Sequence, residues 1–164
     1  MTPEAINALP REAFVDLLGG IFEHSPWVAE QAFAHRPFAS PDDLGAAMKR
    51  AVERATVEEK LALLRAHPDL GTRARVSASS ASEQTGAGLN QLTQEEYDRL
   101  TELNARYREK FGFPFLYAVK GSGKSAIPEA LRIRSENSPE AEFGEALQQV
   151  FRIAWFRLQE LFKL

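Results

Sequence analysis

The sequence contains no cysteine, so it cannot form disulfide bonds, thiolate zinc sites or a cysteine nucleophile. No uninterrupted apolar run approaches the roughly 20 residues that a membrane-spanning helix needs. The first residues, Met1-Thr2-Pro3-Glu4, also lack the basic-then-apolar order of a signal peptide. A basic excess is absent too, because 20 Lys and Arg stand against 23 Asp and Glu without forming a basic stripe. We therefore expect a cytoplasmic protein that binds neither membranes nor nucleic acid.

The length and the apolar content indicate one folded domain. A chain of 164 residues, 44% of them hydrophobic, can bury roughly 70% of the surface that its unfolded form would expose. The sequence contains no internal repeat and no linker. We therefore expect a single domain over residues 1–164.

Four helix starts carry side chains that can accept hydrogen bonds from the unpaired amides of a first turn. Thr56-Val57-Glu58-Glu59 and Thr93-Gln94-Glu95-Glu96 fit the capping box, and Ser40-Pro41 and Ser138-Pro139 combine a capping serine with proline at the first helical position. Together with the apolar periodicity, these starts predict helices over residues 11–22, 26–35, 41–55, 57–66, 80–90, 94–111, 126–136 and 139–163. The predicted fold class is all-α, a bundle of about eight helices.

The last predicted helix has an apolar stripe with an arginine on its flank. The stripe recurs at three- and four-residue steps and consists of Phe143, Leu147, Val150, Ala154, Leu158 and Leu161, so this face should pack on the other helices. Arg157 lies 60° from Ala154 at 100° per residue. A guanidinium in this position either extends outward with its stem packed or is held inward against a carboxylate.

Two stretches depart from the helical pattern and are the places where we expect function. The first runs from His67 to about Ser79 and the second covers residues 113–121. The second is too apolar for a solvated loop. We therefore predict a buried extended segment near 113–121 that lines a site.

His67 is the candidate acid–base residue. Proline disfavours helical geometry in the residue before it, so Pro68 places His67 where its helix stops. A helix C-terminus favours a protonated imidazole, and histidine titrates near neutral pH. The alternative is a histidine that only caps the terminal carbonyls. His24 and His35 receive no role.

The polar run Ser80-Ala81-Ser82-Glu83-Gln84 has two interpretations. Its side chains can enter a pocket at a helix start, where free amides favour anionic ligands. Ser80 and Glu83 can instead form a capping box. The small pair Ala87-Gly88, one turn later, favours a close approach by a ligand or another backbone.

One phosphate-binding motif fails on inspection. Gly121-Ser122-Gly123-Lys124-Ser125 looks like the end of a P-loop, but the pattern needs glycine five positions before Gly123, where this chain has Ala118. The predicted fold also offers no parallel sheet to carry such a loop. A flexible turn followed by a helix start is therefore the better interpretation of residues 121–125. Two other functions are kept as alternatives, namely a nucleotide-phosphate enzyme that uses residues 121–125 and a non-catalytic helical interaction domain.

Taken together, five motifs resemble the OHCU decarboxylase family in order and spacing over nearly the whole chain, where OHCU is 2-oxo-4-hydroxy-4-carboxy-5-ureidoimidazoline. They are His67-Pro68-Asp69-Leu70, Ser80-x-x-Glu83-Gln84-x-x-Ala87-Gly88-Leu89, Lys110-Phe111-Gly112-Phe113-Pro114-Phe115, Arg134-x-x-Asn137 and Arg157-Leu158. The resemblance implies an all-helical homodimer. It also implies that the protein converts OHCU to (S)-allantoin in urate breakdown, with neither a metal nor an organic cofactor.

The same resemblance implies roles for individual residues. His67 would be catalytic, and Glu83 would contact the substrate. Our own hypothesis is that Glu83 acts in catalysis by fixing the imidazole or a ureido N–H. The expected substrate contacts are Pro68, Ser80, Gln84, Arg157 and the backbone groups of Phe115, Leu116, Tyr117 and Ala118.

Overall fold

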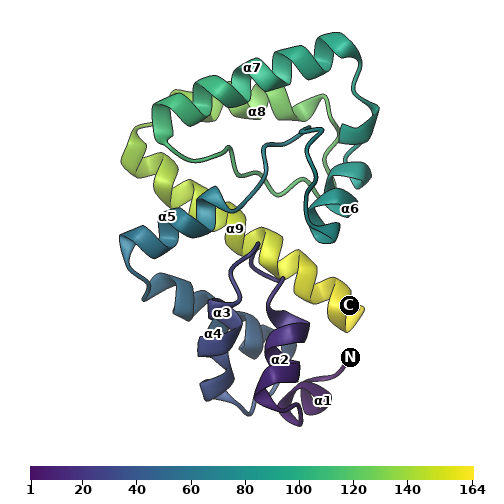
Figure 1. The fold of residues 1–164 in the computed structure, drawn as a ribbon, viewed down its shortest axis with the longest axis vertical. Coiled ribbons are helices and arrows are strands. Elements are labelled where there is room, and N and C mark those ends of the chain that lie inside the picture. The colour runs from purple at the N-terminus through teal and green to yellow at the C-terminus, as the bar shows by residue number, and fades with distance from the viewer. The chain divides into compact units, whose positions relative to one another are not determined.

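The computed structural model describes residues 1–164 and contains nine α-helices, two short 3-10 helices and no β-strand (Figure 1). The α-helices are α1 (Pro3–Asn7), α2 (Arg11–Leu18), α3 (Trp27–Ala32), α4 (Pro41–Glu53), α5 (Val57–Arg65), α6 (Ala78–Gly86), α7 (Gln94–Phe111), α8 (Ala126–Ser135) and α9 (Pro139–Phe162). The 3-10 helices are η1 (Phe33–His35) and η2 (Leu89–Gln91). The predicted all-α class is confirmed. None of the helices is both long and apolar enough to cross a membrane.

The four predicted helix starts are confirmed. Thr56 and Thr93 form complete capping boxes at α5 and α7, and Ser40 accepts from the Asp43 amide at the start of α4. Ser138 Oγ accepts from the Ala141 amide at 3.2 Å, directly before α9.

Helix α1 was not predicted from the sequence. This short helix begins with the same type of signal as α4, because Thr2 Oγ1 accepts from the Ala5 amide and Pro3 occupies the first turn. The signal was present, but five residues are too few for an apolar periodicity to be visible.

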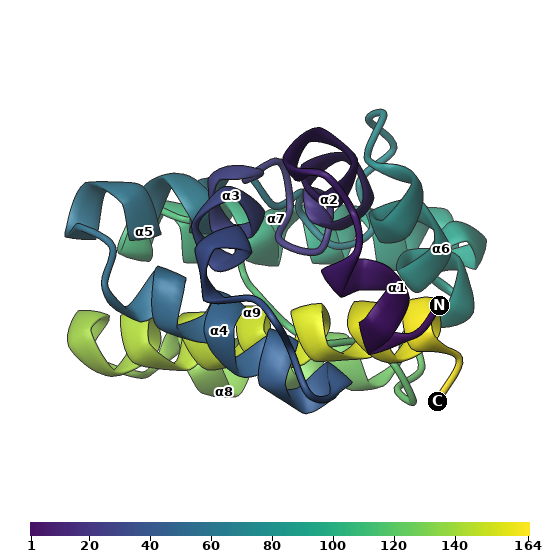
Figure 2. The ribbon, with the colours of Figure 1, turned by 90° about the horizontal axis from the view of Figure 1, so that it is seen from below.

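The chain forms two compact units, one of Met1–Ala66 with Phe151–Leu164 and the other of His67–Val150. In the first unit α3 lies beside α4 (Figures 1 and 2). The core around α2 is aromatic, since the Phe14 ring meets Phe33 edge-on at 5.3 Å and stacks on Phe38 at 6.2 Å. All three side chains contribute apolar area to a single cluster.

In the second unit α7 runs along α8 (Figure 1), and α6 packs with η2. The core of this unit is also aromatic. The Tyr107 ring lies 4.6 Å from Phe111, 6.0 Å from Phe113 and 5.4 Å from Phe115. Two of these partners, Phe113 and Phe115, belong to the non-helical segment that follows α7. The segment is therefore built into the core of the unit.

Candidate active site

His67 is the one buried histidine of the three, with 6% of its surface exposed, whereas His24 and His35 are exposed. It directly follows Ala66, the C-cap of α5, as the position before Pro68 predicts. The burial of His67 at the end of α5 is in keeping with the predicted acid–base role.

The loop after His67 is fixed to helices α6 and α7. Asp69 pairs with Arg108 at 2.9 Å, and the Leu70 carbonyl accepts from Asn104 Nδ2 at 3.0 Å. The Gly71 amide donates to Gln84 Oε1, also at 3.0 Å. Three consecutive residues are thus held by side chains from two helices, which restrains the position of the histidine just before them.

Helix α6 begins at Ala78 rather than at residue 80, and this corrects the interpretation of Ser80. The N-cap is Ser77, whose Oγ accepts from the Ser80 amide at 3.1 Å. The capping-box alternative for Ser80 and Glu83 is therefore wrong. Ser80 lies in the first turn instead and is buried, with 5% exposed.

The inward face of α6 carries the polar residues that the family motif singles out. Ser80, Gln84 and Ala87 are buried and follow one another at four- and three-residue steps, while Glu83 is half-buried beside them. Neighbouring Ser79 and Ser82 are exposed. Because Gln84 Oε1 holds the Gly71 amide, its Nε2 is the group that it can offer to a ligand.

Of the predicted segment near 113–121, residues 113–119 are buried or, at Tyr117, half-buried, whereas Lys120 and Gly121 are exposed. No helix or strand is present between residues 114 and 119. Its backbone is fastened by two buried side chains. Arg134 Nη1 donates to the Leu116 carbonyl, and the Ala118 amide donates to Gln149 Oε1 at 2.9 Å. The guanidinium of Arg134 also lies over the Phe115 ring, at 4.5 Å. The segment therefore has a fixed shape.

Behind this segment, the carboxylate of Glu142 is fully buried and satisfied by three donors. It accepts from Arg134 Nε at 2.7 Å, from Asn137 Nδ2 at 3.0 Å and from the hydroxyl of Tyr107. Burial and the hydrogen bond to Glu142 raise the pKa of Tyr107 well above its ordinary value. The phenol therefore stays protonated and remains a donor across the physiological range.

Arg157, in the first unit, is held inward. Its Nη1 donates to the Gly20 carbonyl at 3.1 Å, and its Nη2 lies 3.6 Å from Glu23 Oε2. Arg157 is 7% exposed and Glu23 is 2% exposed. The outward, solvated alternative for Arg157 is therefore wrong, because the guanidinium is paired with a buried carboxylate.

The glycine-rich stretch 121–125 does not form a phosphate cradle. Lys124 Nζ donates to the Gln91 carbonyl at 3.0 Å and to Glu96 Oε1 at 2.7 Å. The hydrogen bond from Lys124 is the largest of the effects that lower the pKa of Glu96. The ammonium group of Lys124 is thus hydrogen-bonded within the protein, which indicates a structural role and not phosphate binding.

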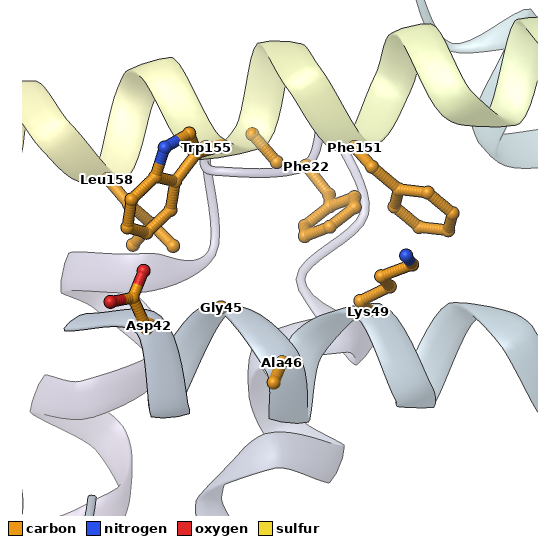
Figure 3. Close-up of a pocket in the computed structure, with 9 residues that line it drawn as sticks. Phe22, Asp42, Gly45, Ala46, Lys49, Phe151, Trp155 and Leu158 are labelled. Carbon is orange, nitrogen blue, oxygen red and sulfur yellow. The ribbon is translucent and has the colours of Figure 1, made fainter. Parts of the chain in front are cut away.

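An open groove of about 170 Å³ lies in the first unit, between α4 and the last turns of α9 (Figure 3). Figure 3 shows Phe151, Trp155 and Leu158 of α9 opposite Gly45 and Lys49 of α4. None of the predicted site residues lines this groove. Elsewhere, no three His, Asp or Glu side chains gather closely enough to hold a metal ion.

Comparison with known proteins gives matches along almost the entire chain. Residues 7–159 match the family model described as OHCU decarboxylase. A 2-oxo-4-hydroxy-4-carboxy-5-ureidoimidazoline decarboxylase of Haloferax volcanii is 49% identical over 162 residues, which cover 99% of this chain and 96% of that protein. A protein of the same description from Halalkalicoccus jeotgali is 44% identical over 161 residues, covering 98% of this chain and 92% of that protein.

A solved structure agrees with the sequence matches. The crystal structure of an (S)-allantoin synthase resembles this fold with a TM-score of 0.77 and 36% sequence identity over 98% of this chain. The present chain spans 54% of that longer chain. An all-helical fold with these relatives defines a carboxy-lyase. The chain belongs to the OHCU decarboxylase family, so the resemblance drawn from its motifs is confirmed.

Sequence reasoning missed two buried carboxylates that organise polar side chains, Glu23 and Glu142. Glu23 lies in Phe22-Glu23-His24-Ser25, where neither periodicity nor a known motif marks it. Glu142 lies within the first turn of α9, where an acidic residue is usually explained by the helix dipole. Gln149 was missed as well, although its spacing of seven residues from Glu142 places both on one face of the helix.

Proposed function

We propose that this chain decarboxylates OHCU to (S)-allantoin in urate degradation, with His67 as its acid–base residue. The reaction follows from family membership, and the chain is a carboxy-lyase. The assignment of site residues rests chiefly on one observation. Of the three histidines His67 alone is buried, and the loop that follows it is tied to the helix that presents Ser80 and Glu83.

The chemistry requires an electron sink and a proton. The bond between ring carbon 4 and its carboxylate breaks, CO2 leaves and the bonding pair spreads into the conjugated imidazolone. The substrate itself accepts this charge, so the proposal needs no cofactor. Two protons are then taken up, one by the ring nitrogen that accepts the bonding pair and one by ring carbon 5 on a single face. The 4-hydroxyl proton is lost as the 4-oxo group forms, so the release of CO2 from the carboxylate with a net uptake of one proton gives (S)-allantoin.

In this scheme His67 takes or shares the 4-hydroxyl proton, and Glu83 fixes either the imidazole or a ureido N–H. Pro68 shapes the pocket beside the histidine. Ser80 and Gln84 donate hydrogen bonds to the substrate, in keeping with their burial on one face of α6. The backbone groups of residues 115–118 receive the ureido and ring edges, since this buried segment has a fixed shape.

Arg157 would pair with anionic or polar atoms of the substrate. Its guanidinium is buried, and the carboxylate of Glu23 and the Gly20 carbonyl restrict its orientation. A planar, oriented guanidinium suits a carboxylate or a delocalised anion better than a flexible ammonium does.

We also propose that the protein is a cytoplasmic homodimer, as the family resemblance implies. The dimer is tested by light scattering coupled to size-exclusion chromatography, where a mass near twice 18.3 kDa is expected. A mass near 18.3 kDa at micromolar concentration would reject it.

The site assignment is tested with freshly generated OHCU, by following the appearance of (S)-allantoin with circular dichroism. We expect His67→Asn to lose a factor of ~10²–10⁴ in kcat while remaining folded, which is the usual contribution of general acid–base help. The matched control is His35→Asn, an exposed histidine that should leave turnover unchanged. Near-normal turnover by His67→Asn would remove His67 from the mechanism.

A further inference from the structure

We infer that Arg134 and Gln149 are positioning residues, because both form hydrogen bonds to one edge of segment 115–118. The backbone groups of Phe115 and Tyr117, on the other edge, then face the ureide of the substrate. The inference rests on the proposed function and narrows it. It concerns which of four consecutive residues bind the ligand and what holds them in place.

The first step is the shape of the segment. The rings of Phe115 and Tyr117 stack at 5.8 Å with an angle of 24° between their planes. Side chains two residues apart share a face when the backbone is extended. In such a backbone the N–H and C=O groups point to the two edges alternately, one residue to each edge. The stacked rings of Phe115 and Tyr117 point to an extended backbone, in which Leu116 and Ala118 share one edge and Phe115 and Tyr117 share the other.

The backbone groups of Leu116 and Ala118, on the first edge, are hydrogen-bonded to side chains of the protein. The Leu116 carbonyl accepts from Arg134, and the Ala118 amide donates to Gln149 Oε1 at 2.9 Å. Both residues are buried, with 8% of the surface of Arg134 and 6% of that of Gln149 exposed. This edge is thus satisfied from within the protein.

The third step is the support behind these two side chains. Glu142 accepts from Arg134 Nε at 2.7 Å and is completely buried. Gln149 Nε2 donates to Glu145 Oε1 at 2.8 Å, which orients the amide so that its oxygen faces Ala118. Each residue that holds the segment is itself held by a carboxylate, as expected of groups that must keep a binding surface in register.

The other edge of the segment, formed by the backbone groups of Phe115 and Tyr117, then offers alternating hydrogen-bond donors and acceptors to the ligand. A ureide is planar and carries N–H donors beside a carbonyl acceptor. The amide and carbonyl of Tyr117, with those of Phe115, offer the complementary pattern along an extended chain. Leu116 and Ala118 then contribute through the position of the backbone and not through direct hydrogen bonds to the ligand.

The first experiment removes the acceptor on Gln149. Because the segment would bind the ureide equally in the ground state and the transition state, Gln149→Met should raise the KM for OHCU about tenfold with little change in kcat. A purely structural defect would lower the amount of active protein, and hence the apparent kcat, at unchanged KM. Gln148→Met, the same change at an exposed neighbour, should alter neither constant.

The second experiment exchanges the side chains at positions 145 and 149. In the double variant Glu145→Gln with Gln149→Glu, a carboxylate oxygen can accept from the Ala118 amide and from the new amide at position 145, and the net charge is unchanged. The KM of this double variant for OHCU should therefore be close to that of wild type and not raised as in Gln149→Met. An unaltered KM in Gln149→Met, with wild type active and His67→Asn inactive, would overturn this inference while leaving the proposed function standing. If wild type fails to turn over OHCU, the proposed function falls and this inference falls with it.

A third measurement needs only the wild-type chain, in case Gln149→Met does not fold. On titration with (S)-allantoin, the amide resonances of Phe115 and Tyr117 should shift more than those of Leu116 and Ala118. Shifts confined to Leu116 and Ala118 would refute the proposed division of the two edges.

Discussion

Gly71, four residues after His67, has a φ of +77°, and alanine there would be both strained and crowded. A Cβ at this position would lie 2.6 Å from Leu100 Cδ2 and 3.0 Å from Leu92 Cδ1. Leu100 is only 3% exposed, so its methyl group cannot retreat without moving its own neighbours. Gly71→Ala therefore combines a backbone penalty with overpacking of the core.

The two contributions can be separated by a matched variant. The left-handed conformation costs an L-residue roughly 1–2 kcal/mol, and overpacking in a filled core typically costs about 1–3 kcal/mol. Gly71→Ala should thus lower the free energy of unfolding by about 2–5 kcal/mol. Gly121→Ala is the control, because Gly121 has a φ of +84° with no atom within 4 Å of the added Cβ. It should lose only the backbone part, roughly 1–2 kcal/mol.

Urea unfolding followed by far-ultraviolet circular dichroism measures both variants, with the midpoints compared at unchanged slope. In the folded fraction, Gly71→Ala should also reduce kcat/KM for OHCU, because the Gly71 amide anchors the loop of His67 to Gln84. Equal destabilisation by the two variants would show that contact with Leu100 contributes nothing. Full activity in a destabilised Gly71→Ala would show that the loop anchor does not position the histidine.

Three further predictions concern single contacts. Arg157→Lys keeps the charge but loses the planar donors, so kcat/KM should fall about tenfold or more, and an unchanged value would make Arg157 structural. Ser77→Ala removes the cap of α6 and should cost about 1 kcal/mol in urea unfolding, whereas Ser79→Ala on the exposed side should cost little. Lys124→Met should return the lowered pKa of Glu96 toward its ordinary value in an NMR titration. Because the pKa of Glu96 is lowered in the folded state, its pairing with Lys124 stabilises the fold at pH values above the ordinary glutamate pKa. This stabilisation is lost as the pH falls through the folded-state pKa. An unchanged Glu96 pKa in Lys124→Met would contradict the assignment.

The helices could be predicted from the sequence because their starts are determined locally. A capping box satisfies its own amides whatever the rest of the chain does, which explains why Thr56 and Thr93 are placed correctly. Where several candidates stand together, local rules are not sufficient. Ser77 and Ser80 both precede helical residues, and only the extended backbone at Ser77 makes it the cap.

The candidate site, too, has features that could be predicted from local sequence and features that could not. The position of His67 at a helix end follows from the proline after it, and the burial of residues 113–119 follows from their apolar composition. The partner of Arg157 could not be predicted, because Glu23 is 134 positions away and no spacing rule connects them. A buried ion pair depends on tertiary packing, which a periodicity does not describe.

The face of α9 shows why apolarity alone was a poor guide there. The predicted stripe is buried at Val150, Ala154 and Leu158, but its other three members, Phe143, Leu147 and Leu161, are only half-buried. Polar residues take buried positions instead, namely Glu142, Gln149 and Arg157. Leaving any of these without a partner would cost more than an apolar residue in the same place, since an unsatisfied buried polar group loses its hydration. Each is partnered in this structure, Glu142 by three donors, Gln149 by Ala118 and Glu145, and Arg157 by Glu23 and Gly20. A helix that buries three polar side chains at this cost, and satisfies each of them, is better explained by the need to hold particular backbone and charged groups in place than by stability.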